Sequence, residues 1–376
     1  MRSLAFASLA FLAVTTGCST EVSKSASETP PKLDLLPGMP AVRDPKNIYS
    51  ETTPDKISPV AKGHRELIYV PNARGNTVSV IDPKTMEVID TLKAGKEPQH
   101  VVPSYDLKTL YATNDQSNTL TAIDPVTGKL IKTIPVEDPY NLYFTPDGKF
   151  AIVVAERLKR LDFADPHTFK VIEKVKVPCR GVDHIDFSPD GRYLIATCEF
   201  SGELVKVDVA SRKVLGTLAT PGGGMPQDIK ISPDGRTWYV ADMDANGVHV
   251  IDGDKFAVTG FLATGKGAHG LYVSRDFKHM YVTNRGEGSI SLINMVTGKL
   301  EETKWRIPGG GSPDMGNVSA DGKVFWVSGR YHHVVYAFDT TSGKLLAKIK
   351  VGRNPHGLCV WPQPGRYSIG HTGVMR

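Results

Sequence analysis

The sequence predicts a seven-bladed β-propeller, an all-β ring of four-stranded antiparallel blades. Three observations lead to this fold: the composition is typical of short strands, one unit recurs seven times at a steady period, and the units carry hairpin turn motifs. The 376 residues include 36 Gly and 26 Pro, which favours many short strands joined by tight turns over long helices.

The period is marked by an apolar strand that ends in a polar or small residue, as in Tyr-Val-Thr-Asn at positions 281–284. These strand ends fall at positions 72, 114, 155, 198, 242, 284 and 329, so successive units lie 42, 41, 43, 44, 42 and 45 residues apart. A unit of this length is the size of one propeller blade. Two stacked sheets, the alternative all-β arrangement, do not require such regular spacing.

Turn motifs join the strands within each unit. In Asp-Pro-Val-Thr-Gly-Lys at positions 124–129, the aspartate can bond local backbone amides and Gly128 can adopt the positive φ of a hairpin bulge. Close relatives of this motif lie at positions 294–299 and 339–344. A second turn, Ser-Pro-Asp-Gly-Arg, occurs at positions 188–192 and 232–236. Each unit is therefore expected to contain four strands.

The Tyr-Val-Thr-Asn strand, taken with these turns, resembles the YVTN family of β-propeller repeats over about residues 66–366. The resemblance implies that the strand before Ser-Pro-Asp-Gly is the innermost of its blade and lines the central channel. The chain starts on a second strand at 67–71 and finishes with an innermost strand at 357–361. We therefore expect the C-terminal strand to complete the N-terminal blade and close the ring, which removes two exposed sheet edges.

The same alignment places two consecutive residues of each innermost strand at the channel mouth. The first members of these pairs are Gln99, Tyr140, Asp183, Gln227, His269, Asp314 and His356. The second members are His100, Asn141, His184, Asp228, Gly270, Met315 and Gly357. The predicted rim is thus markedly polar, although the strands that carry it continue as apolar segments.

Four of the rim residues are histidines, namely His100, His184, His269 and His356, out of 11 in the chain. Any ring of strand ends that faces channel water needs polar residues, and this accounts for the Gln, Asn and Asp. Clustered His with Asp and Met is also the ligand chemistry of a metal ion or of haem-type iron. The sequence leaves both interpretations open, a solvated rim or a metal or haem-type cofactor site at the four histidines.

Two cysteines accompany one of these histidines. Cys179 precedes the inner strand that carries Asp183 and His184, and Cys198 ends the strand expected to pair with it. Outside the cytosol a disulfide between the two cysteines is favoured, and a Cys/Cys/His metal site is the alternative. Cys359, on the last inner strand, is expected to be a buried core thiol.

The N-terminus predicts export and a lipid anchor. Residues 1–18 combine a basic start, an apolar run and small residues before Cys18, which is typical of an export signal and resembles a bacterial lipoprotein signal. The alternative is an ordinary secretory signal, since Thr15 stands where the lipoprotein pattern prefers an aliphatic residue. Residues 19–60, rich in Pro, Ser and Thr, are expected to form a flexible tether, and 61–376 the propeller. The predicted location is the outer side of a bacterial membrane.

These features suggest classes of function. The net charge of +5 is spread along the chain without a cationic stripe, so no nucleic-acid partner is expected. A binding module for a protein or small molecule at the rim needs nothing beyond the residues seen, and it is favoured over catalysis. The alternative is a redox or maturation protein, because the repeats are distantly similar to propellers that hold modified haem in nitrite reductases and haem-maturation lipoproteins. A lactonase-like hydrolase, using Asp183, Asp228 and Asp314, is a third hypothesis.

Overall fold

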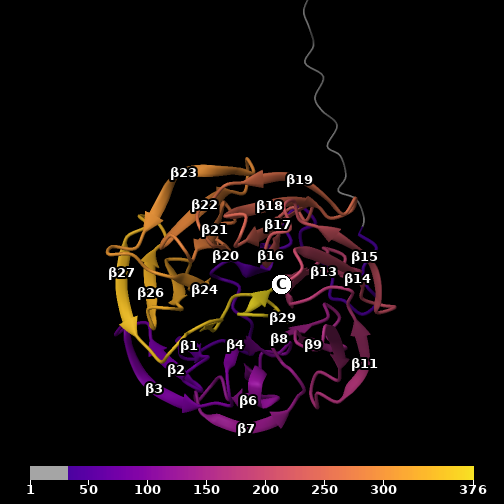
Figure 1. The fold of residues 1–376 in the computed structure, drawn as a ribbon. Coiled ribbons are helices and arrows are strands. Elements are labelled where there is room, and N and C mark those ends of the chain that lie inside the picture. Colours follow the sequence, from indigo (N-terminus) through magenta and orange to yellow (C-terminus); the bar gives the residue numbers. More distant parts are fainter. Residues whose placement is uncertain (1–32) are drawn as a thin grey trace, which may run out of the picture. The chain divides into compact units, whose positions relative to one another are not determined.

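The computed structural model of the protein describes residues 33–376. The predicted signal segment, Cys18 and the start of the predicted tether lie outside the described residues. The described part is a ring of seven antiparallel sheets around a central axis (Figure 1). The seven-bladed propeller predicted from the repeat is therefore confirmed.

In six blades the strands run outward from the channel in chain order, and in the remaining blade the C-terminal β28 is innermost. The blades are β28–β1–β2–β3 (Cys359–Trp361, Leu67–Asn72, Thr77–Asp82, Glu87–Lys93); β4–β7 (Pro98–Pro103, Leu110–Asn114, Thr119–Ile123, Leu130–Pro135); β8–β11 (Asn141–Phe144, Ala151–Ala155, Arg160–Ala164, Val171–Lys176); β12–β15 (Val182–Phe187, Tyr193–Cys198, Glu203–Asp208, Lys213–Ala219); β16–β19 (Pro226–Ile231, Thr237–Asp242, Gly247–Asp252, Ala257–Leu262); β20–β23 (Ala268–Val273, His279–Asn284, Ser289–Asn294, Lys299–Arg306); and β24–β27 (Pro313–Val318, Val324–Gly329, Val334–Asp339, Leu345–Lys350). In the described residues the only helices are two short 3₁₀ turns, η1 (Ser50–Thr52) and η2 (Asp115–Ser117), and none is long and apolar enough to span a membrane.

The ring closes as the repeat predicted. Strand β28 pairs antiparallel with β1, with Trp361 opposite Leu67 and Cys359 opposite Tyr69. The C-terminal strand thus completes the N-terminal blade, and the ring has no open seam. This joint pairs residues almost 300 positions apart in the chain, a contact of very high sequence separation.

The four strands of a blade differ in how deeply their residues are buried. The three inner strands of a blade are covered on both faces by neighbouring blades, and β1, β12 and β24 are buried at every residue. The outermost strands alternate instead, as β15 does with exposed and half-buried residues, because one face meets water. The apolar clusters lie between adjacent blades, for example where Tyr281 packs on Phe325 with ring centroids 5.2 Å apart.

The strand-end asparagine of the repeat has a structural role. Asn72 donates from Nδ2 to both Thr77 and Ser79, and Asn284 does the same to Ser289 and Ser291. One buried amide thus links the second strand of a blade to the third. In the blade of β12–β15 this position is Cys198, which forms a disulfide instead.

A β-bulge in the inner strand sets up the channel lining. The pairing of β4 with β5 skips two residues between Pro98 and Val101, and the pairs β12–β13, β16–β17, β20–β21 and β24–β25 skip two residues at the equivalent place. The freed backbone amide of His100 donates to the Thr113 hydroxyl at 3.1 Å, and that of His184 to Thr197 at 3.0 Å. Because the bulge breaks the alternation of side chains, the side chains of two consecutive residues can point toward the channel.

Residues 33–60 differ from the predicted flexible tether, because the structure packs them against the propeller. Leu36 donates its amide to the Asp190 carbonyl, Ile48 donates its amide to the Pro233 carbonyl, and the Tyr49 hydroxyl donates to Ile231. The Pro-rich composition without periodicity did not predict this packing. The segment lies along the surface of the propeller because Ile48 and Tyr49 pack into one of its apolar clusters.

The residues after β28 turn back into the ring. Strands β29 (Ser368–Gly370) and β30 (Val374–Met375) extend the sheet of β8 at the centre of the molecule, where Figure 1 places the C-terminus. The buried Arg376 lies 2.8 Å from Asp186 of β12, and its guanidinium stacks on Tyr49. The tail therefore occupies the end of the channel at which the inner strands finish, and it contributes His371 to the interior.

Candidate functional site

The opposite end of the channel, where the inner strands begin, opens into a cavity of about 590 Å³. We call this cavity the mouth. Five of the predicted rim residues line it, all of them first members of their pairs: Gln99, Tyr140, Gln227, His269 and His356. The remaining lining consists mainly of charged residues from the loops, including Glu156, Glu199, Arg285 and Arg330.

The other predicted rim residues lie deeper than the mouth. His100, Asn141, Asp183, His184, Asp228, Asp314 and Met315 are buried and do not line the cavity. The sequence placed all twelve on one solvated rim. The structure distributes them over two levels: five line the mouth, and the other seven lie deeper in the interior.

The four histidines proposed as one metal site fall into two groups. One nitrogen each of His100, His184 and the tail residue His371 lie within 4.8 Å of one another. A second group with the same spacing consists of His269, His356 and Asp314. The two groups meet where the His100 and His356 rings lie 4.8 Å apart.

The two groups differ in electrostatics. Asp314 is already held by two guanidinium groups, with Arg285 Nη1 at 2.9 Å and Arg330 Nη1 at 3.4 Å. At the first group, Asp183 Oδ2 lies 2.9 Å from His184 Nδ1 and has no arginine or lysine partner among the described residues, whereas Asp228 Oδ1, 4.0 Å from His371 Nε2, is paired with Lys230 Nζ at 3.5 Å. A cation is thus favoured at the first group and opposed at the second.

Most of these histidines are neutral at physiological pH. Burial lowers the pKa of His100, His269, His356 and His371 well below the usual value, and nearby positive charges add to the effect. Burial also acts to lower the pKa of His184, but the neighbouring Asp183 carboxylate outweighs it and raises that pKa. Neutral imidazole is the form that binds metals.

One wall of the mouth carries carboxyl groups without basic partners. Burial, followed by the charges of Glu199 and Asp183, raises the pKa of Glu156 above its usual range. Burial and Asp183 raise the pKa of Glu199 to about 7. Within residues 33–376, neither glutamate forms an ion pair; Glu199 accepts a hydrogen bond from Gln227 Nε2 at 2.9 Å. This wall favours a positive charge.

Two of the predicted site residues have structural partners instead. The Asp228 carboxylate accepts hydrogen bonds from the backbone amides of Ile229 and Leu271, each at 2.9 Å. The Met315 sulfur lies 2.9 Å from the Tyr272 hydroxyl and is packed in an apolar cluster. The aspartates of the lactonase hypothesis, Asp183, Asp228 and Asp314, each contact different partners and do not form one group.

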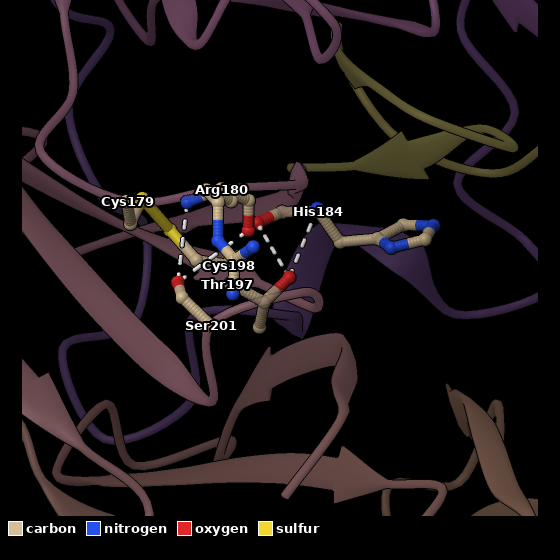
Figure 2. The surroundings of a disulfide bond; sticks show 6 residues. All are labelled: Cys179, Arg180, His184, Thr197, Cys198 and Ser201. Carbon is tan, nitrogen blue, oxygen red and sulfur yellow. Dashed lines mark hydrogen bonds between the residues drawn. A yellow bond between two sulfur atoms is a disulfide. The ribbon is translucent and has the colours of Figure 1, made fainter. Parts of the chain in front are cut away.

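The cysteines lie beside His184 without contacting the channel. Cys179 and Cys198 form a disulfide with an S–S distance of 2.06 Å, so the structure has the disulfide and not the Cys/Cys/His alternative. Figure 2 shows the His184 imidazole directed away from this bond, while its backbone is held by Thr197. Cys359 is free and buried, and burial raises the pKa of its thiol.

Sequence reasoning missed three functional candidates: His371, Glu156 and Glu199. His371 follows the last repeat, so the period gave it no position. Glu156 and Glu199 directly follow the strand ends at 155 and 198, and reading the residue after each strand end around the ring would have found both.

The repeat, the ring closure and the channel agree with a comparison to known families. Residues 48–364 match the family described as YNCE-like beta-propeller. The chain belongs to this family. The match covers all seven blades of this YncE-like propeller and most of residues 33–66, and it stops before the C-terminal tail that carries His371. No curated protein sequence matches the chain.

Solved structures similar to this YncE-like propeller share its fold. Hydrazine synthase of Kuenenia stuttgartiensis is 19% identical, with a TM-score of 0.65, covering 84% of this chain and 99% of that one. A protein of unknown function from Desulfotomaculum acetoxidans is 17% identical, with a TM-score of 0.67, covering 78% and 98%. The dihydro-heme d1 dehydrogenase NirN, in complex with DHE, is 15% identical, with a TM-score of 0.59, covering 81% and 76%. These similarities show the fold alone.

Proposed function

We propose that this protein is an extracytoplasmic, membrane-anchored binding module whose channel mouth binds a small ligand with a cationic group. The observation that carries the proposal is the wall formed by Glu156 and Glu199, two half-buried carboxyl groups that line an open cavity of about 590 Å³ and form no ion pair within residues 33–376. A ligand ammonium would supply the missing positive charge. The N-terminal signal and Cys18 support an anchored, extracytoplasmic location.

The opposite side of the mouth adds selectivity. Arg285 and Arg330 share the single carboxylate of Asp314, so this side keeps an excess positive charge. A ligand that also carries an anionic group would be bound at both ends. Zwitterions and basic amino acids therefore fit the mouth better than simple dianions do.

The test is a thermal-shift and calorimetry panel on the purified full-length protein, with diamines, basic amino acids, quaternary amines, dicarboxylates and neutral sugars. We expect saturable stabilisation by at least one amine, and we expect affinity to rise between about pH 6 and pH 8 as Glu199 loses its proton. The Glu156→Gln/Glu199→Gln double variant should bind at least about tenfold more weakly, since it removes the Glu199 charge and the Glu156 carboxyl that a bound cation would ionise.

The matched control is Glu87→Gln, an exposed carboxyl on the outer strand β3, which should leave binding unchanged. The proposal fails if no amine stabilises the protein, or if an amine binds equally well to the double variant.

A haem-type cofactor is a second candidate. His269 and His356 line the same mouth and each has an Nδ1 without a hydrogen-bond partner, and arginines stand beside them. Imidazole nitrogen can ligate haem iron, and guanidinium groups pair with carboxylates such as propionates. Titration with haem should then give a shifted Soret band that disappears in His269→Ala/His356→Ala; an unshifted spectrum would exclude this candidate.

A further inference from the structure

The histidine group deeper in the channel has a different chemistry from the mouth. His100 comes from β4, His184 from β12, and His371 from the tail between β29 and β30, so three distant parts of the chain converge there. Their ring centroids are separated by 5.5 Å (His100–His184), 5.1 Å (His100–His371) and 4.8 Å (His184–His371). All three side chains are fully buried.

The contacts of His100 and His184 leave their outer nitrogens free. His100 Nδ1 lies 3.1 Å from the Tyr140 carbonyl oxygen, which only accepts hydrogen bonds, so Nδ1 carries the proton and Nε2 keeps its lone pair. His184 Nδ1 lies 2.9 Å from Asp183 Oδ2, which favours the proton on the same nitrogen, although the two groups are not aligned as a hydrogen bond. Both Nε2 atoms are buried without a hydrogen-bond partner. A carbonyl or carboxylate behind Nδ1 is the usual support for a metal-binding imidazole.

Polar atoms that are buried without partners destabilise a fold unless something binds them. This cluster concentrates such atoms, because His371 Nε2 and both carboxylate oxygens of Asp183 also lack hydrogen-bond partners. These atoms lie together where the tail, β4 and β12 meet. A bound cation would satisfy the nitrogens and the adjacent negative charge together.

We propose that His100, His184 and His371 bind one divalent transition-metal ion, such as Zn²⁺ or Cu²⁺, inside the channel. Three neutral imidazoles are a ligand set suited to these ions and leave at least one coordination position for water or another ligand. Asp183, which has no arginine or lysine partner among the described residues, supplies negative charge beside the cluster. The group of His269, Asp314 and His356 is not such a site, because two arginines already occupy its carboxylate.

His371 requires one adjustment to take part. Asn141 Oδ1 accepts a hydrogen bond from the Leu142 backbone amide, which fixes the orientation of the Asn141 side chain. Asn141 Nδ2 therefore donates a hydrogen bond to His371 Nδ1 at 3.0 Å, and the proton of His371 is on Nε2. Coordination through Nε2 moves this proton to Nδ1 and turns the Asn141 amide. We therefore expect His371 to contribute less to metal affinity than His100 or His184.

Glycine at position 357 makes room for the site. A Cβ at this position would stand 2.1 Å from His100 Cδ2, so Gly357→Ala must push the imidazole away from its place. The Gly357→Ala variant therefore displaces the His100 imidazole without removing it.

The test uses untagged full-length protein, stripped with a chelator and titrated with Zn²⁺ and Cu²⁺ by calorimetry. We expect one ion per chain, and we expect the dissociation constant to rise by about 100-fold in His100→Ala or His184→Ala and by about tenfold in His371→Ala and Gly357→Ala. The His167→Ala variant, at an exposed histidine outside the channel, is the control and should change affinity by less than about threefold.

A second measurement does not depend on the folding of variants. The Cu²⁺ complex of the unaltered protein should show nitrogen hyperfine splitting in electron paramagnetic resonance. The proposal is overturned if the protein binds neither ion, if the spectrum shows oxygen ligands only, or if the control variant loses the ion while His100→Ala retains it. None of these results depends on which ligand the mouth binds.

Discussion

At the scale of single residues, the channel holds ionisable groups that have few partners. Glu199 is an example, because it accepts one hydrogen bond, from Gln227, and forms no ion pair within residues 33–376. Its pKa is raised to about 7 by burial and Asp183, whereas an unfolded glutamate ionises near pH 4.3. The folded protein therefore holds a proton that the unfolded chain releases.

This difference predicts a pH-dependent effect of Glu199→Gln. Between about pH 4.5 and 7 the folded state binds more protons than the unfolded state, so stability falls as pH rises through this window. Gln keeps the oxygen that accepts from Gln227 and removes the charge. We expect the variant to be more stable than the parent by roughly 1–2 kcal/mol at pH 8 and equal to it near pH 4.5, measured by urea unfolding.

The exposed Glu87→Gln variant serves again as the comparison and should show the same difference from the parent at both pH values. A Glu199→Gln protein whose stability follows the parent at pH 8 would contradict the raised pKa. The same experiment would show whether the mouth holds a proton when it is empty.

At the scale of the element, the blade of β12–β15 is linked differently from three others of the ring. Where those blades link their second and third strands through Asn72, Asn114 or Asn284, this blade has Cys198 bonded to Cys179. The disulfide fixes the segment that leads into Asp183 and His184, and Figure 2 shows Cys179 and His184 in the same region of this blade. The blade with the cross-link is thus one that supplies a candidate metal ligand.

The disulfide is expected to stabilise the protein mainly by restricting the unfolded chain. Its cysteines are separated by 19 residues, and closing a loop of this size contributes about 3 kcal/mol. The Cys179→Ala/Cys198→Ala variant should lower the free energy of unfolding by about that amount. Reductant should weaken the parent equally and leave the variant unaffected; a parent insensitive to reductant would contradict the cross-link.

At the scale of the whole molecule, one end of the channel is covered by other segments of the chain and the other end is open. Residues 33–60 and the C-terminal tail both pack where the inner strands finish, with Leu36 bonded to Asp190 and Arg376 to Asp186. The other end stays open as the mouth. A ligand therefore has one entrance, and an ion bound to His100 and His184 would be reached past Tyr140 and His356.

The predicted anchor also belongs to this scale and can be tested in cells. Replacing Cys18 with Ser removes the acceptor of the lipid, so the protein should move from the detergent phase to the aqueous phase in detergent partitioning. The neighbouring Ser19→Ala variant should stay with the detergent. If the Cys18→Ser protein also remained in the detergent phase, the anchor would not be a lipid on that residue.

The sequence by itself determined the architecture, because period, turn residues and alternating apolar positions are local signals that repeat seven times. The seven blades, the closure by β28 and the closeness of Cys179 to Cys198 could all be predicted in this way. Only the tertiary structure decided how the histidines group. The bulges separate mouth residues from deeper ones, and His371 reaches His100 and His184 across more than 180 residues of chain. No local pattern encodes such a contact, since it arises when the tail fills the end of a ring that the other residues have built.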